Sequence, residues 1–149
     1  METMTNYHQG RYKPENPQKY AGNVNQIIYR SSWELQVMIK FDRTDSVILW
    51  NSEGLAIPYL SPLDGEIHRY FPDFLIKVRE KTGVEKTYLI EIKPHSQTHL
   101  RTQKRNTRKF LNEVATYSIN RAKWAAADLF CKEQGWTFKV ITEKDESFA

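Results

Sequence analysis

Two strand-like runs joined by a short turn constrain the fold of this chain more than any other feature. The runs cover residues 69–79 and 84–93, and Lys81-Thr82-Gly83 lies between them. Three-residue hairpin loops favour glycine at their last position, where φ is positive. If Gly83 takes that position, Glu80 pairs with Val84, and the antiparallel register of both runs follows from this pair.

This register brings compatible side chains together along the whole hairpin. The cross-strand pairs that it predicts are Phe74–Ile90, Leu75–Leu89, Ile76–Tyr88, Lys77–Thr87, Val78–Lys86 and Arg79–Glu85. Apolar residues meet apolar residues and opposite charges meet, which is the pattern that cross-strand pairing favours. The same register places Asp73 directly opposite Glu91.

The remaining patterns predict an α/β fold with a mixed central sheet flanked by helices. Ser31-Ser32-Trp33-Glu34 matches a capping box, which predicts a helix start near Ser31. Residues 46–50 resemble a short strand, and residues 55–65 are rich in turn formers. Helical patterns follow towards residues 110–117 and again over 120–134, where Gly135 is the expected stop. Residues 136–141 alternate as a final strand.

The chain divides into three predicted parts. Residues 1–30 are rich in Asn, Gln, Tyr, Lys and Pro, and we expect an extended N-terminal arm outside the core. The arm either packs on its own domain or serves as an arm that binds a partner or tracks DNA. Residues 31–142 form the main domain, and residues 143–149 form an acidic tail.

Composition narrows the class of protein. Of 149 residues, 40% are hydrophobic and 13% aromatic, which is enough apolar material for a folded core. The net charge of +4 favours a polyanionic partner. Cys131 is the single cysteine, so it cannot form an internal disulfide, and we expect it to be buried as a small apolar residue. The sequence contains no apolar run of about 18 residues, so we expect no membrane-spanning helix.

Two carboxylates and a lysine meet at one end of the predicted hairpin. Glu91 and Lys93 are two residues apart in a strand and therefore point to the same face, and Asp73 lies opposite Glu91 on that face. Facing carboxylates repel each other unless a cation lies between them. Carboxylate oxygens, with the Ile92 carbonyl as a further ligand, suit Mg²⁺, and Mn²⁺ is expected to substitute. With Lys93 orienting or deprotonating a metal-bound water, this set predicts phosphodiester hydrolysis.

A basic segment follows directly. Residues 95–112 contain five Lys or Arg residues and no acid, so we expect this stretch to hold a phosphate backbone, although a solvated helix face is the plain alternative. His68 and Arg69, which precede the motif, also lie within reach of DNA. The predicted DNA-binding residues are His68, Arg69, His95, Arg101, Lys104, Arg105, Arg108 and Lys109.

Pro72-Asp73 followed by Glu91-Ile92-Lys93 resembles the signature of the PD-(D/E)xK restriction-endonuclease-like family. Further segments are similar to the head completion nucleases of T-even phages, and a more distant similarity links the chain to the end-cleaving endonuclease subunit of some transposons. The segments that carry the similarity to head completion nucleases are Tyr20-Ala21-Gly22-Asn23, Tyr29-Arg30-Ser31-Ser32-Trp33-Glu34, Phe71-Pro72-Asp73-Phe74 and Asn120-Arg121-Ala122-Lys123-Trp124.

The resemblance implies a restriction-endonuclease-like domain over residues 31–142 and a DNA endonuclease that acts in phage head completion during virion assembly. It implies metal carboxylates at Asp73 and Glu91, a catalytic lysine at Lys93, and a further glutamate near the metal at Glu34. Head or portal vertex proteins are then expected partners, and the host cytoplasm or the virion the expected location. A non-catalytic DNA- or portal-binding head completion factor with a nuclease fold is the alternative, and an RNA-directed nuclease is a minor one. The sequence does not decide whether the protein is a monomer or a dimer.

Overall fold

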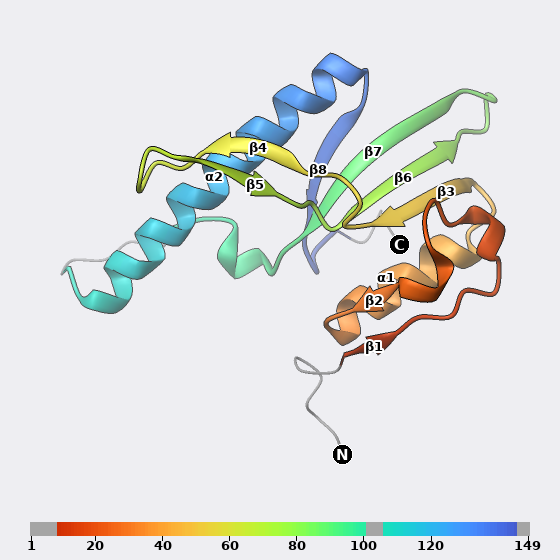
Figure 1. The fold of residues 1–149 in the computed structure, drawn as a ribbon, viewed down its shortest axis with the longest axis horizontal. Coiled ribbons are helices and arrows are strands. Elements are labelled where there is room, and N and C mark those ends of the chain that lie inside the picture. The colour runs from red at the N-terminus through yellow and green to blue at the C-terminus, as the bar shows by residue number, and fades with distance from the viewer. Residues whose placement is uncertain (1–8, 101–105, 146–149) are drawn as a thin grey trace.

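Four strands form a mixed central sheet in the computed structural model, which describes residues 9–100 and 106–145. The order across the sheet is β3-β6-β7-β8 (Figure 1). These strands are β3 (Val47–Ser52), β6 (Phe74–Arg79), β7 (Glu85–Ile92) and β8 (Thr137–Ile141). The first three are antiparallel to their neighbours, whereas β8 runs parallel to β7. The predicted mixed α/β architecture is confirmed.

The register of the β6–β7 hairpin is the predicted one. All six expected cross-strand pairs are present, from Phe74 opposite Ile90 to Arg79 opposite Glu85. In the turn, the Glu80 amide donates to the Val84 carbonyl at 2.8 Å, and Gly83 has a φ of 90°. A side chain would be strained at that φ, so glycine at this position is what makes the short turn accessible.

The run at residues 69–79 is two strands and not the single strand that the sequence predicts. β5 (Ile67–Tyr70) pairs with β4 (Ile57–Leu60) in a separate two-stranded sheet, and β6 begins only at Phe74. Pro72 lies in the break, and proline cannot donate a hydrogen bond to a ladder. Asp73 therefore lies just beyond the ladder, not in a cross-strand pair with Glu91. Residues 55–65, predicted as turns, contain β4, whose Pro58 is tolerated because the sheet has only two strands.

The two α-helices pack on opposite faces of the sheet (Figure 1). On one face, Met38 and Phe41 of α1 (Ser32–Arg43) join a core that includes Phe74 and Ile90. On the other, three residues of α2 (Arg108–Gln134) join a core that includes Leu89, namely Trp124, Ala127 and Cys131. Successive residues of β7 thus enter different cores, as the two-residue period of a strand requires.

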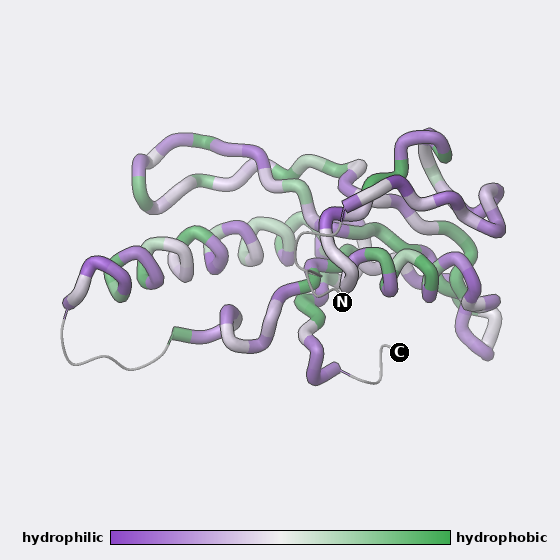
Figure 2. Tube along the Cα trace, turned by 90° about the horizontal axis from the view of Figure 1, so that it is seen from below, coloured by the Kyte–Doolittle hydropathy of each residue, from purple (hydrophilic) through white to green (hydrophobic). Residues whose placement is uncertain are grey.

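α2 is one continuous helix, whereas the sequence predicts two helical segments. Gly135 ends it as predicted, with a φ of 79°. The buried residues of α2 start only at Asn120. The N-terminal half extends past the sheet beside the segment that follows β7 (Figure 2). This half has little core to pack against, which explains its weak apolar stripe. Within the described ranges no helix has the length and apolar character needed to cross a membrane.

The N-terminal segment is part of the main core, which corrects the expectation of an arm outside it. β1 (Gly10–Arg11) pairs with β2 (Ile28–Tyr29), and two short 3₁₀ helices lie between them, η2 (Pro17–Lys19) and η3 (Val24–Gln26). Tyr12 and Ile27 are buried in the core on the α1 side of the sheet. Of the two alternatives for this segment, packing on its own domain agrees with the structure for residues 9–30. Residues 1–8 lie outside the described residues.

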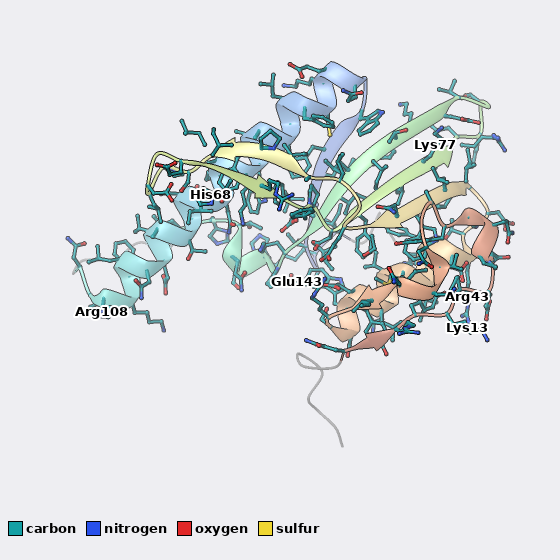
Figure 3. All side chains as sticks on the ribbon, viewed as in Figure 1. Lys13, Arg43, His68, Lys77, Arg108 and Glu143 are labelled. Atoms are coloured by element: carbon teal, nitrogen blue, oxygen red, sulfur yellow. The ribbon has the colours of Figure 1, made fainter. Side chains whose placement is uncertain are left out.

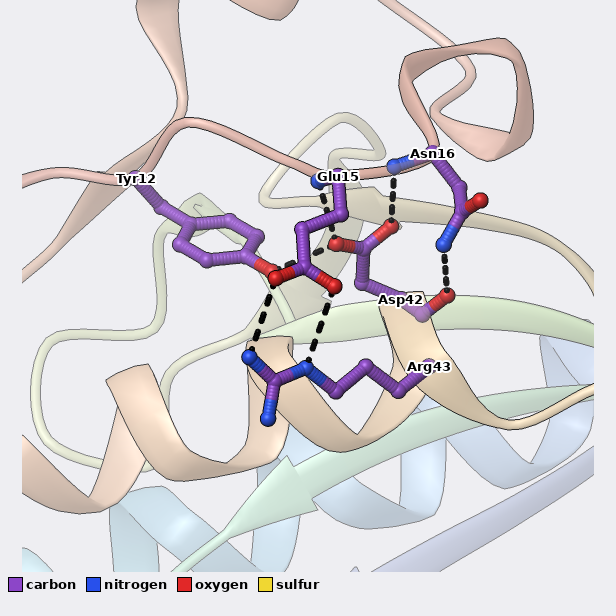
Figure 4. Close-up of polar contacts among 5 residues, drawn as sticks. All are labelled: Tyr12, Glu15, Asn16, Asp42 and Arg43. Carbon is purple, nitrogen blue, oxygen red and sulfur yellow. Dashed lines mark hydrogen bonds and ion pairs between the residues drawn. The ribbon is translucent and has the colours of Figure 1, made fainter.

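Asp42, near the end of α1, holds this segment in place. Its fully buried carboxylate accepts hydrogen bonds from the Tyr12 hydroxyl at 2.6 Å and from the Glu15 and Asn16 amides at 2.7 and 3.0 Å (Figure 4). Burial alone would raise the pKa of Asp42, but these hydrogen bonds outweigh it and hold the pKa below its usual value. The carboxylate therefore stays charged and ties the segment to α1.

Candidate active site

The β6–β7 hairpin brings Asp73 and Glu91 to the same face of the sheet. Leu75 and Leu89, two residues from each, both pack with the core on the α2 side. Side chains alternate along a strand, so Asp73 and Glu91 point to that side as well. The Oδ2 atom of Asp73 accepts a hydrogen bond from the Ile92 amide at 2.8 Å, which joins the end of β6 to the end of β7.

Glu91 is a buried carboxylate with a partner on each oxygen. Only 8% of the residue is exposed. Its Oε1 accepts a hydrogen bond from the Tyr70 hydroxyl at 2.7 Å, and its Oε2 lies 3.6 Å from the Lys93 ammonium. Glu91 and Lys93 therefore lie side by side as the sequence predicts, while Tyr70 is a contact that the sequence analysis missed.

The electrostatics of the pair favour a bound cation. Burial, followed by the nearby Glu91 carboxylate, raises the pKa of Asp73 to about 8, against a lowering effect of the Ile92 amide. Burial and Glu91 also raise the pKa of Tyr70, so its hydroxyl remains a donor. A divalent cation beside Asp73 and Glu91 would offset the negative charge of both carboxylates.

Comparison with known proteins places this geometry in a family. Residues 44–143 match the family described as TnsA-like endonuclease N terminal, and the match includes Asp73, Glu91 and Lys93. The chain belongs to the TnsA-like endonuclease family. It is also 36% identical over 141 residues to the head completion nuclease of Enterobacteria phage T4, with 90% of each chain covered. The predicted resemblance to PD-(D/E)xK-type nucleases and to head completion nucleases is confirmed.

Glu34 lies before the matched part of this TnsA-like domain but close to the carboxylates. Ser31 Oγ accepts from the Glu34 amide at 3.1 Å, as the capping box predicts. The Glu34 carboxylate accepts from the Arg30 amide at 2.9 Å, one residue earlier than a capping box requires. Burial first, then Glu53 and Glu91, raise the pKa of Glu34. The residue thus caps α1 and also contributes to the negative potential at the site.

Glu53 is a further acidic residue at this TnsA-like site that the sequence analysis missed. Its amide donates to the Asp73 carbonyl at 3.0 Å, and its carboxylate forms an ion pair with Arg30. It also has a φ of 52°, which is uncommon for a residue other than glycine. The Asn51-Ser52-Glu53-Gly54 stretch signals a turn at the end of β3, but no local pattern reveals that this turn lies against Asp73. No sequence pattern predicts the contact of Tyr70 with Glu91 either, because it depends on how the chain bends between β5 and β6.

The oxygen set of this endonuclease site fits Mg²⁺ in the way that enzymes usually bind it. Among the residues that the structure describes, no group of three or more His, Cys, Asp or Glu side chains is arranged to hold a metal ion. Mg²⁺ keeps several waters and is commonly held by one or two carboxylates together with substrate phosphates, so two acidic side chains suffice. Asp73 and Glu91 supply these oxygens, and neither His nor Cys is required.

The predicted DNA-binding residues that the structure describes lie on three different elements. His68 and Arg69 lie on β5, where His68 Nε2 is 2.9 Å from Asp64 Oδ2 and Arg69 lies over the Phe71 ring. His95 is in η4 (His95–Gln97), two residues after Lys93. Arg108 and Lys109 open α2, at the end remote from the sheet (Figure 3). Arg101, Lys104 and Arg105 lie outside the described residues.

Proposed function

We propose that this TnsA-like chain is a Mg²⁺-dependent DNA endonuclease that hydrolyses phosphodiester bonds. The observation that carries the proposal is that Asp73 and Glu91 lie near each other at one end of the hairpin, with the Lys93 ammonium 3.6 Å from Glu91. A family match over residues 44–143 supports an endonuclease, and the site chemistry supports the metal. Mn²⁺ is expected to substitute for Mg²⁺, since both prefer oxygen ligands.

In this proposal each residue of the site has a distinct task. Asp73 and Glu91 bind the cation, which when bound lowers the pKa of a water and offsets charge on the attacked phosphate. The Ile92 amide donates to Asp73, and the N–H and C=O of one strand residue point to the same side, so the Ile92 carbonyl is directed towards the metal ligands. Lys93 orients the water and stabilises negative charge that develops on the phosphate. Glu34 adds negative potential near the metal or a ligand contact.

The DNA backbone is proposed to lie along the basic residues on either side of this centre. His68 and Arg69 precede Asp73 in the chain, and His95 follows Lys93, so both ends of the motif carry groups suited to phosphate. Arg101, Lys104, Arg105, Arg108 and Lys109 continue the basic segment. Such contacts give affinity that falls with salt concentration and carry no sequence preference.

We further propose that the enzyme acts in phage head completion, in the host cytoplasm during virion assembly or bound to the virion. The support is the similarity to the head completion nuclease of phage T4 over nine-tenths of both chains. Head or portal vertex proteins would then be its partners. A non-catalytic head completion factor would need the same fold but would not need Asp73, Glu91 and Lys93. The choice between an enzyme and such a factor therefore depends on the function of these three residues.

Plasmid nicking tests the enzymatic proposal. The wild-type protein should convert supercoiled plasmid to the open circle with Mg²⁺ or Mn²⁺, and EDTA should stop the reaction. Asp73→Asn should lower the rate at least about a hundredfold, because one metal carboxylate is lost while the acceptor for the Ile92 amide is kept. A labelled RNA in the same buffer tests the choice of nucleic acid.

The matched control is Glu85→Gln, which removes an exposed carboxylate from the opposite end of the same hairpin. It should nick at the wild-type rate. Equal nicking by wild type and Asp73→Asn would exclude the assigned centre. If purified wild-type protein never nicks DNA but restores infectivity to phage heads that lack their head completion nuclease, the non-catalytic alternative is correct.

A further inference from the structure

A groove lined by both polar and apolar surface runs along the N-terminal half of α2, beside the segment that follows β7. Its volume is about 970 Å³. Its lining residues belong to η4 and the residues after it on one side and to α2 on the other. These two segments run beside each other in Figures 1 and 2. Ser96, at the start of the groove, is three residues after Lys93, so their Cα atoms lie within about 11 Å of each other. The groove therefore opens close to the catalytic centre.

The α2 wall is one continuous stripe of polar side chains. Positions four residues apart lie above one another on a helix, and two such rows line the groove. The residues that carry the following argument are Arg108, Lys109, Asn112, Thr116, Tyr117 and Asn120. From Arg108 to Asn120 the helix rises about 18 Å. This half of α2 contributes nothing buried before Asn120 to the protein core, so the core does not account for its side chains.

Charge on the groove favours an anionic ligand. Arg108 and Lys109 lie at its outer end, and in the described part of the chain neither is paired with a carboxylate. His99 contributes a further nitrogen group on the opposite wall. Glu113 is the one acid among the lining residues that the structure describes, and it has an interaction partner of its own.

Asn120 gives the groove a side-chain amide at its inner end. The residue is 9% exposed and lines the groove. An amide both donates and accepts hydrogen bonds, so it is suited to the edge of a base. Tyr117 supplies an aromatic ring one turn away.

We infer that this groove binds a single-stranded DNA segment adjoining the cleavage point, a role that rests on the proposed nuclease function and narrows its substrate. Duplex DNA presents phosphates outside and keeps its bases paired, so a recessed amide and ring would have little to contact. A single strand offers phosphates to Arg108 and Lys109, a base face to Tyr117 and a base edge to Asn120. The length of the groove along α2 therefore suits a short run of nucleotides.

The preferred substrate is accordingly a duplex with a single-stranded arm at the cleavage point, such as an overhang or a flap. Fluorescence anisotropy tests this with full-length Asp73→Asn in EDTA, so that no cleavage occurs. The probes are a blunt labelled duplex and the same duplex with an overhang of about five nucleotides. We expect the overhang to bind about tenfold more tightly, within the range for one base–aromatic stack.

Tyr117→Ala, made in the Asp73→Asn background, should remove this preference and leave blunt-duplex binding unchanged. Asn112→Ala, which alters an exposed groove position and does not endanger the fold, should weaken overhang binding alone. The charge variant Arg108→Gln/Lys109→Gln should weaken overhang binding. The control Lys13→Gln/Lys81→Gln should not, because it removes one exposed lysine far from Arg108 (Figure 3) and one in the turn of the β6–β7 hairpin.

Equal affinity for blunt and overhang duplexes would overturn the inference, and so would a Tyr117→Ala variant that keeps the preference. The inference is also overturned if Arg108→Gln/Lys109→Gln weakens binding of the blunt and overhang duplexes equally, because both residues would then contact the duplex. None of these outcomes bears on Mg²⁺-dependent nicking of plasmid, which tests the nuclease proposal separately. If the protein cuts plasmid but shows no preference for the overhang, the nuclease proposal holds and the inference about the groove is rejected.

Discussion

At the scale of the residue, Tyr70 determines how Glu91 presents its carboxylate. Its hydroxyl holds Oε1 at 2.7 Å, which leaves Oε2 on the side of Lys93. Tyr70 is itself buried, so it has few other orientations available. A hydrogen bond to a charged group contributes about 1.5–3 kcal/mol in a protein interior. Tyr70 is therefore a positioning residue for a proposed metal ligand.

Tyr70→Phe should raise the Mg²⁺ concentration needed for half-maximal nicking about tenfold, a change at the low end of that energy range. The freed carboxylate must be ordered by the metal itself, so saturating Mg²⁺ should recover most of the rate. The measurement is a Mg²⁺ titration of plasmid nicking, with thermal unfolding recorded in parallel.

The matched control is Tyr59→Phe, in the neighbouring strand. Tyr59 is buried too, and its hydroxyl has no hydrogen-bond partner within the described residues. The Tyr59→Phe variant should nick plasmid with the same Mg²⁺ dependence as the wild type. If Tyr70→Phe lowers stability while its Mg²⁺ midpoint stays at the wild-type value, Tyr70 has a structural role only.

The raised pKa of Asp73 predicts how pH affects stability in the absence of metal. A carboxyl whose folded-state pKa is about 8 rather than its usual value near 4 favours the fold while it is protonated. This contribution is complete below about pH 4 and is lost as pH rises towards 8. Asp73→Asn should therefore stabilise the metal-free protein by about 2 kcal/mol at pH 8.5 and by much less at pH 5.

Urea denaturation in EDTA at the two pH values measures this difference. Subtracting the wild-type value from that of Asp73→Asn cancels histidines and other groups that titrate equally in both proteins. Parallel stability profiles for the two proteins would mean that Asp73 is not strained by its neighbours. Adding Mg²⁺ should stabilise the wild type and leave Asp73→Asn almost unchanged.

At the scale of the element, the hairpin and the caps were predictable, and the breaks in strands were not. Gly83, the alternation of apolar residues and the pairing of Arg79 with Glu85 together specify one register. Ser31 and Gly135 mark the ends of helices by local chemistry alone. The break at Pro72 was missed because strand-forming residues continue on both sides of it, and what separates β5 from β6 is the pairing of β5 with β4.

The N-terminal segment was misjudged for a similar reason. Its Pro and Asn residues are typical of irregular chain, and such chain usually lies outside a core. Here the carboxylate of one distant residue, Asp42, accepts hydrogen bonds from the Tyr12 hydroxyl and from two backbone amides of the segment. Tyr12 and Ile27 of the segment are buried in the core. No local pattern reports a contact across about 30 positions.

Asp42→Asn should destabilise the protein by about 2–4 kcal/mol, because a charged acceptor of three buried donors is replaced by a neutral amide. The wild-type advantage exists above pH 4, where the carboxylate is ionised in both states, and is lost as pH falls through its lowered folded-state pKa. Urea denaturation at neutral and acid pH measures this effect.

Asp45→Asn removes the same charge from an exposed turn three residues on and should change stability by less than about 0.5 kcal/mol. Protease sensitivity of residues 9–30 gives a second measurement, since Asp42→Asn should expose that segment to cleavage. Equal unfolding midpoints for Asp42→Asn and Asp45→Asn would show that Tyr12 and Ile27 hold the segment without Asp42.

At the scale of the whole molecule, the site lies where several elements of the fold converge. The hairpin supplies Asp73, Glu91 and Lys93, the start of α1 supplies Glu34, and the turn after β3 supplies Glu53. Each element is held by its own core contacts, so the acidic groups are kept near one another by packing and not by their mutual attraction. The packing energy of the two cores offsets the cost of burying Asp73 and placing it near Glu91, the two effects that raise its pKa.

The amino-acid sequence alone determined the register of the hairpin, the helix caps, the family resemblance and the meeting of Asp73 with Glu91 and Lys93. These depend on turn geometry and on residue spacing within a short stretch, where the period of the backbone sets which side chains share a face. Tertiary structure alone decided which further residues lie at the site, namely Tyr70 and Glu53. It also decided the docking of the N-terminal segment and the groove along α2. Each brings together residues far apart in the chain, and no local periodicity records which distant surfaces will pack.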